Sequence, residues 1–572
     1  MSRYVRPWAA SLLAVFAAGA IAACGGSNSS SSAANSSSAA PAATGSGSGT
    51  STGASTGTSG GKSGGTITID SGTPPLSADP GLDFTTQGNE LESVIDTPLL
   101  TFKRGVEGAA GSTIIPALAT GLPEASNGGK TYTFTLRPNL HYSDGSAIKA
   151  SDVITAVERD LKIPWQAASF ISGYVKGADA YAKGKAKTIS GLKADDTKGT
   201  LTVNLVAPFS PIVDIFALPG TAPVPPSTPA KNLASKGTIG DGPYMWSSIN
   251  PEHQYVLVQN PKFDVPGLPK GHAAKIIYNV NSNVLANAEQ VLDNQADVFD
   301  PGDTLPPSIL QKIKSSATDR YKTVPLNSSW YFWFGVEKAP FNNIYAREAV
   351  LAATDMRALS RLDSGFMTPD CHLIPFGIPG HSSPSSCPFH NPNGPPNMTL
   401  AKSLMKKSGM IGQPVTIYGE ERSPRRQYLD YFAGVLNSLG FKATEKVVNS
   451  GVYFTTIGAP TLKPQMGFGD WNQDFPEPWD FMQLFAGNAG SSLNYGYVND
   501  PHFNQQIASL SQKATPGVAS QWAALDQYAV NHAYYAAYGH EAKVKFYSNK
   551  LDFNAGVMSV EYLTDLTSLQ LK

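Results

Sequence analysis

The stretch "SSWYFWFGVEKAPF", residues 328–341, contains five consecutive aromatic residues, from Trp330 to Phe334. Successive side chains of a β-strand point to opposite faces, so an unbroken aromatic run makes both faces apolar. The stretch therefore predicts a strand buried on two sides, as where two lobes of a protein meet. Most of these rings are expected in a plain core. One or two are expected to face a cavity, and we assign Trp330 to a binding site.

The segments on either side of this strand predict alternating helices and strands. Period-two patterns predict strands in four places, and apolar stripes at helical spacing predict helices in four others. The expected strands lie at 67–69, 131–140, 200–206 and 252–264, and the expected helices at 345–362, 400–408, 428–439 and 521–538. Ser151 or Asp152 is expected to cap a further helix after the turn at Asp144-Gly145. Helix, glycine and strand in close succession, as at Gly440, indicate α/β lobes.

Length and charge limit the class of protein. A chain of 572 residues is too long for one hydrophobic core, so two or more lobes are expected. The formal net charge is −1, which provides no strong field for nucleic acid or an anionic membrane. No G-x-x-x-x-G-K-[ST] loop is present, so any energy for transport must come from another protein.

The N-terminus predicts export. Arg3 and Arg6 precede an apolar run from Trp8 to Ala23, which is shorter than the ~20 residues that span a bilayer. This pattern predicts a signal peptide over residues 1–23. Its end, "IAAC", resembles a bacterial lipobox in which Cys24 is lipidated; an ordinary signal peptide is the alternative. Residues 24–65 are rich in Ser, Gly, Ala and Thr and predict a disordered tether.

Two cysteines remain after Cys24. An exported protein with two cysteines usually pairs them, so we predict a disulfide between Cys371 and Cys387. Zinc binding by these cysteines with His372, His381 and His390 is an alternative, although the spacing matches no standard zinc finger. A third possibility is that the two cysteines remain unpaired thiols. We expect no metal and no cofactor.

The stretch "DWNQDFPEPWD", residues 470–480, carries four carboxylates and three aromatic rings without a basic residue. A glycosidase needs two carboxylates that flank a sugar. Pro476 and Pro478 indicate a loop or sheet edge, and one loop can hardly supply both groups. A carboxylate shielded from water would instead bind a ligand ammonium, with rings adding cation–π attraction. A solvated acidic loop with its rings in the core is the alternative.

Several blocks along the chain resemble the bacterial extracellular solute-binding proteins of family 5, the peptide and nickel group of ABC-transporter receptors. The most recognisable is "LATGLPEASNGGKTYTFTLRPNLHYSDGSAIKASDVITAVERDL", and "GDGPYMW", "VLDNQADVF", "AREAVLAATDMRAL" and "LAKSLMKKSGM" follow in the family's order. Asn127-Gly128-Gly129 replaces the usual Asp-Gly, and Tyr142 replaces the usual Phe. The similarity extends from about Gly64 to the C-terminus.

The resemblance implies an α/β, two-lobed periplasmic-binding-protein-like fold of type II, cluster C, with two hinge crossings. Residues 66–328 are then expected in lobe I, with an extra subdomain at about 101–215. Residues 329–540 are expected in lobe II, and residues 541–572 return to lobe I. The aromatic strand falls near the first crossing, and the last helix leads to the second. The ligand is enclosed when the lobes close about the hinge.

The same resemblance assigns roles to individual residues. "DWNQDFPEP" is similar to the loop of oligopeptide-binding members in which an Asp pairs with the peptide's α-amino group, and by position this Asp is Asp474. Trp471 and Phe475 are then expected to bound the site. Thr86 and Gln87 are expected to lie against the ligand from the first lobe.

The resulting hypothesis is a lipid-anchored, monomeric receptor, not an enzyme. It is expected on the outer face of the cytoplasmic membrane or in the periplasm, where it would bind a short peptide and deliver it to ABC permease subunits, with no nucleic acid partner. A nickel complex, an oligosaccharide or a siderophore is the alternative cargo. A secreted hydrolase is a remote alternative: "GASTG" fits a nucleophile pattern around Ser55, but no strand precedes it and no helix follows.

Overall fold

The computed structural model describes residues 63–163, 165–459, 461–487, 493–559, 561 and 563–572. The expected signal peptide, the lipidation site Cys24, Ser55 and nearly all of the expected tether lie outside these residues. Within them, no helix combines the length and apolar character needed to cross a membrane.

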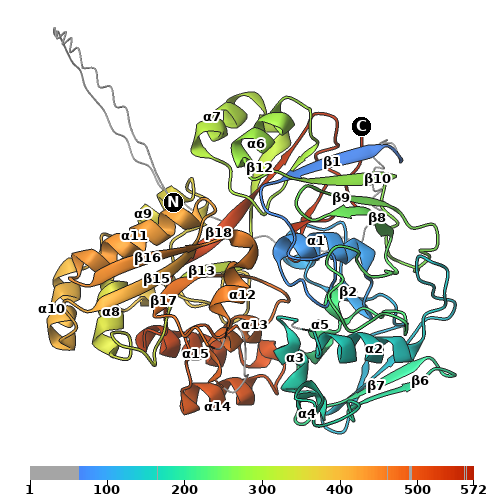
Figure 1. The fold of residues 1–572 in the computed structure, drawn as a ribbon, viewed down its shortest axis with the longest axis horizontal. Coiled ribbons are helices and arrows are strands. Elements are labelled where there is room, and N and C mark those ends of the chain that lie inside the picture. The colour runs from blue at the N-terminus through green and yellow to red at the C-terminus, as the bar shows by residue number, and fades with distance from the viewer. Residues whose placement is uncertain (1–62, 164, 460, 488–492, 560, 562) are drawn as a thin grey trace, which may run out of the picture. The chain divides into compact units, whose positions relative to one another are not determined.

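One mixed sheet of twelve strands runs through both lobes of the described chain (Figure 1). Its main path joins, in spatial order, β16 (Lys442–Val448), β15 (Pro414–Glu420), β17 (Met466–Asn472), β13 (Ser328–Phe334), β18 (Tyr535–Tyr547), β11 (Val298–Phe299), β1 (Thr66–Ser71), β10 (Lys275–Val280), β9 (Gln254–Gln259) and β8 (Tyr244–Asn250). β12 (Tyr321–Pro325) and β14 (Met367–Thr368) also pair with β18. The fold is therefore α/β and two-lobed, as expected.

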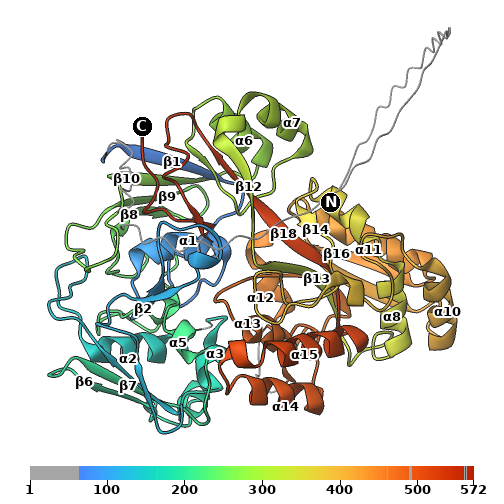
Figure 2. The same cartoon turned by 180° about the vertical axis from the view of Figure 1, so that it is seen from behind.

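β18 is the strand that belongs to both lobes. Its first half pairs antiparallel with β13, and its second half pairs antiparallel with β12 and β11. β12 and β13 are joined by only two residues, Leu326 and Asn327, and together they run opposite to β18. Two antiparallel connections thus cross between the lobes, and Figure 2 shows β18 passing from one to the other.

Lobe I holds the N-terminal strands and a second, smaller sheet. That sheet has the order β4 (Glu124–Ser126), β5 (Thr131–Thr135), β7 (Thr200–Asn204), β6 (Leu192–Asp195). Tyr132 and Phe134 of β5 are buried on one face, as their period-two pattern predicted. α2 (Ala150–Asp160) packs nearby and begins one residue before the expected cap. The carboxylate of Asp152 accepts a hydrogen bond from the Lys149 N–H at 2.9 Å and so caps the helix from its first turn.

The helices of lobe II differ from expectation in two places. The predicted helix 345–362 is two helices, α8 (Ile344–Ala353) and α9 (Met356–Leu362), because the Asp355 carboxylate accepts the first N–H groups of α9 and starts a new helix. The predicted helix 521–538 ends early. α15 spans Ala519–Asn531, and Tyr535 already begins β18, so the alanine-rich end of this stretch is strand. Tertiary pairing with β13 overrides helix propensity there.

The remaining elements cover the sheet faces or connect its strands. The helices are α1 (Thr86–Ile95), α3 (Ala168–Ser172), α4 (Ala178–Ala182), α5 (Ile212–Ile215), α6 (Val284–Leu292), α7 (Pro307–Ser316), α10 (Met398–Ser408), α11 (Arg425–Ser438), α12 (Tyr453–Ile457), α13 (Pro478–Met482) and α14 (Pro501–Leu510). The short strands are β2 (Leu100–Phe102), β3 (Ile114–Pro116), β19 (Met558–Ser559) and β20 (Leu563–Thr564).

The prediction that the aromatic strand is buried on both faces is confirmed, since every residue of β13 is buried. Phe332 contacts Phe432 of α11, with ring centroids 4.1 Å apart, on one face of the sheet. Tyr331 meets Phe485 on the other face. Glycines of the neighbouring strand β17 make room for the large rings, because Trp333 pairs with Gly467 and Tyr331 with Gly469.

The glycine at position 467 is expected to be essential for this packing. A Cβ there would lie 2.3 Å from the Trp333 ring, which is closer than any ordinary contact. We expect Gly467→Val to lower the free energy of unfolding by at least ~1–3 kcal/mol, the usual effect of overpacking a core. Urea unfolding measures this. Gly434→Ala is the control, because that exposed helical position has no atom within 4 Å, and it should be neutral or stabilising by up to ~1 kcal/mol. Equal unfolding curves for the two variants would contradict the packing described.

Candidate functional site

A cavity that is open to solvent lies between the two lobes, and it encloses about 1100 Å³ when the open solvent at its mouth is included. Its lobe I wall comes from the segment after β1 and from the start of α1, and its lobe II wall from the end of β17, the loop after β15 and the segment around α12. The C-terminal segment adds Glu561 and Leu563. A second hollow shares Leu76, Gln166, Phe454, Thr455 and Tyr495 with the first and extends it along the interface.

Four of the six side chains assigned to the ligand from the sequence line this cavity. They are Thr86 and Gln87 from the first turn of α1, and Trp471 and Asp474 from the end of β17 and the loop after it. The Thr85 hydroxyl caps α1 by accepting a hydrogen bond from the Gly88 N–H, which fixes the first turn at the cavity edge. The structure therefore brings together residues that are far apart in the sequence.

The other two assigned residues, Trp330 and Phe475, are not among the lining residues. Trp330 is 2% exposed and packs beneath the guanidinium of Arg425, 4.9 Å from the ring centroid. Phe475 is fully buried against Phe170 and Trp479. Phe475 follows Asp474 directly but points into the core, so the loop presents its carboxylate to the cavity and its ring to the protein interior.

The four carboxylates of residues 470–480 have three different environments. Asp470 and Glu420 both pair with the guanidinium of Arg425, whose Nε lies 2.8 Å from a Glu420 oxygen. Glu477 accepts a hydrogen bond from the Thr515 hydroxyl and does not line the cavity. Asp474 and Asp480 form the third environment, because the Asp474 N–H donates to the Asp480 carboxylate at 2.8 Å.

Asp474 is the acid of this stretch that has, among the described residues, neither a cation nor a hydrogen-bond donor at its Oδ2. Within the described chain no Lys or Arg forms an ion pair with it, and its Oδ2 is buried without a hydrogen-bond partner. Burial, together with repulsion from Asp480, raises the pKa of Asp474 well above its usual range. Burial also raises the pKa of Asp480 to about 7, although the Trp471 indole N–H donates to it at 3.0 Å. A cationic group in the cavity would restore the negative charge that burial disfavours.

A second buried acid faces the cavity from the C-terminal segment. Glu561 accepts a hydrogen bond from Gln473, and its Oε2 has no partner. Burial raises the pKa of Glu561 to about 8. Sequence reasoning missed Glu561, Arg422 and Arg425, because only the fold brings these residues to β17. The basic run that contains both arginines, residues 422–426, is a signal that could have suggested partners for the acidic stretch.

Hydrogen bonds connect the two walls. The Arg422 guanidinium of lobe II donates to the Thr73 hydroxyl of lobe I, and Gln473 donates to Ser112 at 3.2 Å. Side chains of both lobes are therefore close enough to contact the same ligand.

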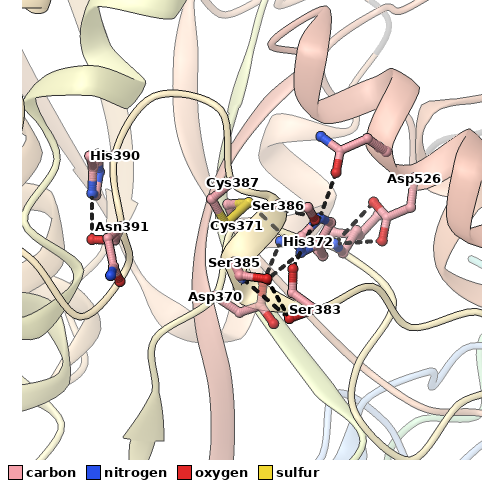
Figure 3. The surroundings of a disulfide bond; sticks show 12 residues. Asp370, Cys371, His372, Ser383, Ser385, Ser386, Cys387, His390, Asn391 and Asp526 are labelled. Atoms are coloured by element: carbon pink, nitrogen blue, oxygen red, sulfur yellow. Dashed lines mark hydrogen bonds and ion pairs between the residues drawn. A yellow bond between two sulfur atoms is a disulfide. The ribbon is translucent and has the colours of Figure 1, made fainter.

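The cysteines and histidines that motivated a zinc alternative lie away from this cavity. Cys371 and Cys387 are joined in a disulfide (Figure 3), so neither is a free thiolate for a metal. His372 hydrogen-bonds through Nδ1 to Asp370 at 2.8 Å, and His390 bonds to the Asn391 carbonyl. The described lining of the interlobe cavity contains no histidine or cysteine.

Comparisons with known proteins agree with this architecture. A family model described as "Bacterial extracellular solute-binding proteins, family 5 Middle" matches residues 113–492. The "Probable deoxycholate-binding periplasmic protein YgiS" of Escherichia coli (strain K12) is 29% identical over 302 residues, 50% of this chain and 54% of that relative. The chain thus spans about half the length of this relative. The "Probable D,D-dipeptide-binding periplasmic protein DdpA" of the same strain is 25% identical over 397 residues, 66% and 69% of the two chains.

Among solved structures, "Clavulanic acid biosynthesis oligopeptide binding protein 2" is similar in fold. It superimposes with a TM-score of 0.75 at 21% identity, covering 89% of this chain and 96% of the other. The fold similarity therefore extends over nearly all of the described residues.

Arg425 is expected to be critical for the lobe II wall. Its removal would leave Asp470 buried without a cation and Glu420, which is only 1% exposed, with the longer 3.5 Å contact to Arg422 alone. We expect Arg425→Gln to lower the free energy of unfolding by about 3–5 kcal/mol, measured by urea denaturation. Arg426→Gln is the matched control on the same helix, because Arg426 pairs with Asp430 and Glu445 near the surface and should contribute at most ~1 kcal/mol. Equal losses in the two variants would refute the role assigned to Arg425.

Proposed function

Because this chain belongs to the bacterial extracellular solute-binding proteins of family 5, whose members are binding receptors and not enzymes, we propose that it binds short peptides between its lobes. In this proposal it is the exported receptor of an ABC importer and hands its ligand to permease subunits of the membrane. Asp474 recognises the ligand's α-ammonium group.

The observation that carries this proposal is the carboxyl group of Asp474, a residue of the cavity lining whose Oδ2 is buried without a hydrogen-bond partner. An unpaired carboxylate removed from water is costly, and a ligand ammonium that pairs with it recovers that cost. Trp471 and Phe84, whose ring centroids are 6.0 Å apart, line the same cavity and add cation–π attraction of roughly 0.5–2 kcal/mol.

The rest of the lining suits a peptide backbone. Thr86, Gln87 and Asn472 present neutral hydroxyl and amide groups, which can donate to and accept from peptide groups directly or through water. The adjoining hollow extends the space along the interface, as an extended ligand requires. A metal complex would find no imidazole or thiolate in the described lining, and Asp474 and Glu561 favour a cationic ligand group at their end of the cavity, whereas Arg422 and Arg425 line another part of it.

The membrane arrangement is proposed from the sequence alone. Lipidation at Cys24 would anchor the chain, and the Ser/Gly-rich residues that follow would let the receptor move about 35 Å from the membrane as a flexible tether. The receptor is proposed to act as a monomer.

The first test changes only the charge of the anchoring group. We expect Asp474→Asn to weaken binding of free-amino tri- and tetrapeptides by about 2–5 kcal/mol, measured by isothermal titration calorimetry, because the ligand ammonium loses its counter-charge. N-acetylation of the same peptides should weaken binding to the unaltered receptor to a similar degree. The cargo class itself is identified by native mass spectrometry of the ligand that copurifies with the protein.

Glu477→Gln serves as the matched control, because Glu477 belongs to the same loop but lies outside the cavity lining. Its peptide affinity should equal that of the unaltered protein. Equal affinity for free and acetylated peptides would remove the role of Asp474 but leave a receptor of another cargo. A copurified ligand that is not a peptide would remove the peptide assignment.

Binding is also expected to depend on pH. In the free receptor the raised pKa of Asp474 favours its protonated form, and a bound ammonium favours the carboxylate and lowers that pKa. Binding therefore releases a proton, so affinity should rise with pH until Asp474 is ionised in the free receptor. Above about 8 it should fall as the ligand α-amino group loses its own proton.

Calorimetry in buffers of different ionisation enthalpy counts the protons released at about pH 6. The Asp474→Asn variant should release fewer, and its affinity should change less with pH. An uptake of protons on binding would contradict the proposed pairing.

A further inference from the structure

Three ionisable side chains meet where lobe II contacts the crossing strand β18, away from the peptide cavity. Asp370 lies two residues after β14, His381 lies in the loop closed by the disulfide, and His540 lies on β18. β14 pairs with β18 at Thr368 and His540, which brings Asp370 beside His540. Their candidate donor atoms all lie within 4.8 Å of one another.

We propose that Asp370, His381 and His540 bind one divalent transition-metal ion, of which Zn²⁺ is the simplest example. The ligand atoms are Oδ2 of the aspartate and Nε2 of each imidazole. Two imidazoles and one carboxylate form a donor set that zinc and its neighbours in the first transition row accept, and a water molecule would complete a four-coordinate site.

In both imidazoles Nε2 is the ring nitrogen that is free to bind a metal. The Nδ1 of His381 lies 2.8 Å from the Ile374 carbonyl oxygen, and the Nδ1 of His540 lies 2.8 Å from the Ser328 carbonyl oxygen. A carbonyl oxygen only accepts hydrogen bonds, so Nδ1 carries the proton in both rings. In the neutral rings Nε2 then carries the free lone pair. Metal-binding histidines commonly have this second hydrogen bond to a backbone carbonyl.

The carboxylate is oriented in the same way. Its other oxygen, Oδ1 of Asp370, accepts hydrogen bonds from the backbone N–H of His372 at 3.0 Å and from its Nδ1 at 2.8 Å. This leaves Oδ2 pointing toward the other two histidines. Both Oδ2 of Asp370 and Nε2 of His540 are buried without a hydrogen-bond partner, although each is a strong hydrogen-bonding atom.

The separations between the donor atoms are also compatible with a metal site. Oδ2 lies 3.4 Å from Nε2 of His540 and 3.7 Å from Nε2 of His381. Charge-assisted hydrogen bonds are typically about 2.7–2.9 Å long, and the contact of Asp370 with His372 has that length. Two ligands bound tetrahedrally to one ion at about 2.0–2.1 Å lie about 3.3 Å apart. The two carboxylate–imidazole separations are therefore long enough for an ion to lie between these donors.

The site has a route to solvent and a structural consequence. The His381 side chain is 17% exposed. The half-exposed ring of Phe376 covers the rest of the site, with its centroid 4.7 Å from the ring centroids of His381 and His540. An ion held here would connect the disulfide loop of lobe II to β18, whose His540 is also bonded to Ser328 at the start of β13. It would brace the place where both crossing strands enter lobe II.

The test uses the tag-free full-length chain with its disulfide intact, stripped with a chelator and titrated with Zn²⁺ at about pH 7.5. We expect one ion per chain with a dissociation constant in the micromolar range or tighter, and a rise of several degrees in Tm when Zn²⁺ is present in excess. His381→Gln, at the exposed side of the site, should weaken binding at least 30-fold. The exposed histidine of lobe I, in His253→Gln, is the matched control and should change nothing.

Two results would overturn the proposal: a stripped wild-type chain that binds no Zn²⁺, or equal Zn²⁺ affinity in His381→Gln and the wild type. X-ray absorption of the zinc-loaded wild type gives a test that does not depend on a variant folding. It should show nitrogen and oxygen neighbours at about 2.0–2.1 Å with imidazole scattering. A sulfur neighbour at about 2.3 Å would assign the ion to reduced Cys371 and Cys387 and refute the proposed ligand set.

Discussion

The whole structure depends on the pairing of β18 with two different sets of strands. Its first half forms hydrogen bonds with β13, and its second half does so with β12 and β11, so one continuous sheet serves both lobes. Within the described residues, this strand and the β12–β13 segment are the two connections between the lobes, and extended segments of this kind can act as a hinge. These crossings hold the two walls of the cavity close together, and one hydrophobic cluster also continues from lobe I into lobe II through the contacts of Phe170 with Phe475 and Trp479.

The placement of charge within that cavity follows from the same geometry. A buried carboxylate is stable only with a cation, a set of hydrogen-bond donors or a proton. Arg425 supplies the cation for Asp470 and Glu420, and the Thr515 hydroxyl supplies a donor for Glu477. Asp474 has neither a cation nor a full set of donors on its side chain, and this difference marks it among four acids that look alike in sequence.

The junction of the crossing strands shows a related arrangement. Ser328 begins β13, and its backbone carbonyl orients His540 of β18 through a hydrogen bond. Asp370 is held by His372 in the loop that the disulfide closes. The residues that hold the crossing strands in place therefore also orient the donor atoms of the proposed metal site. A bound ion would depend on the same hydrogen bonds as the crossing strands.

The sequence alone determined the elements whose signal is local. Five adjacent aromatics predict a strand with two apolar faces, and the alternation at 131–140 predicts a half-buried strand; both strands are present, although the second ends at Thr135. The position of Asp474, Trp471, Thr86 and Gln87 at one cavity agrees with a family resemblance carried by short motifs. Only the tertiary structure decided that Trp330 and Phe475 point into the core, that residues 535–538 are strand, and that Arg425 neutralises Asp470 while Asp474 stays unpaired. The physical reason is that charge pairing and burial depend on neighbours brought from distant parts of the chain, which no local pattern specifies.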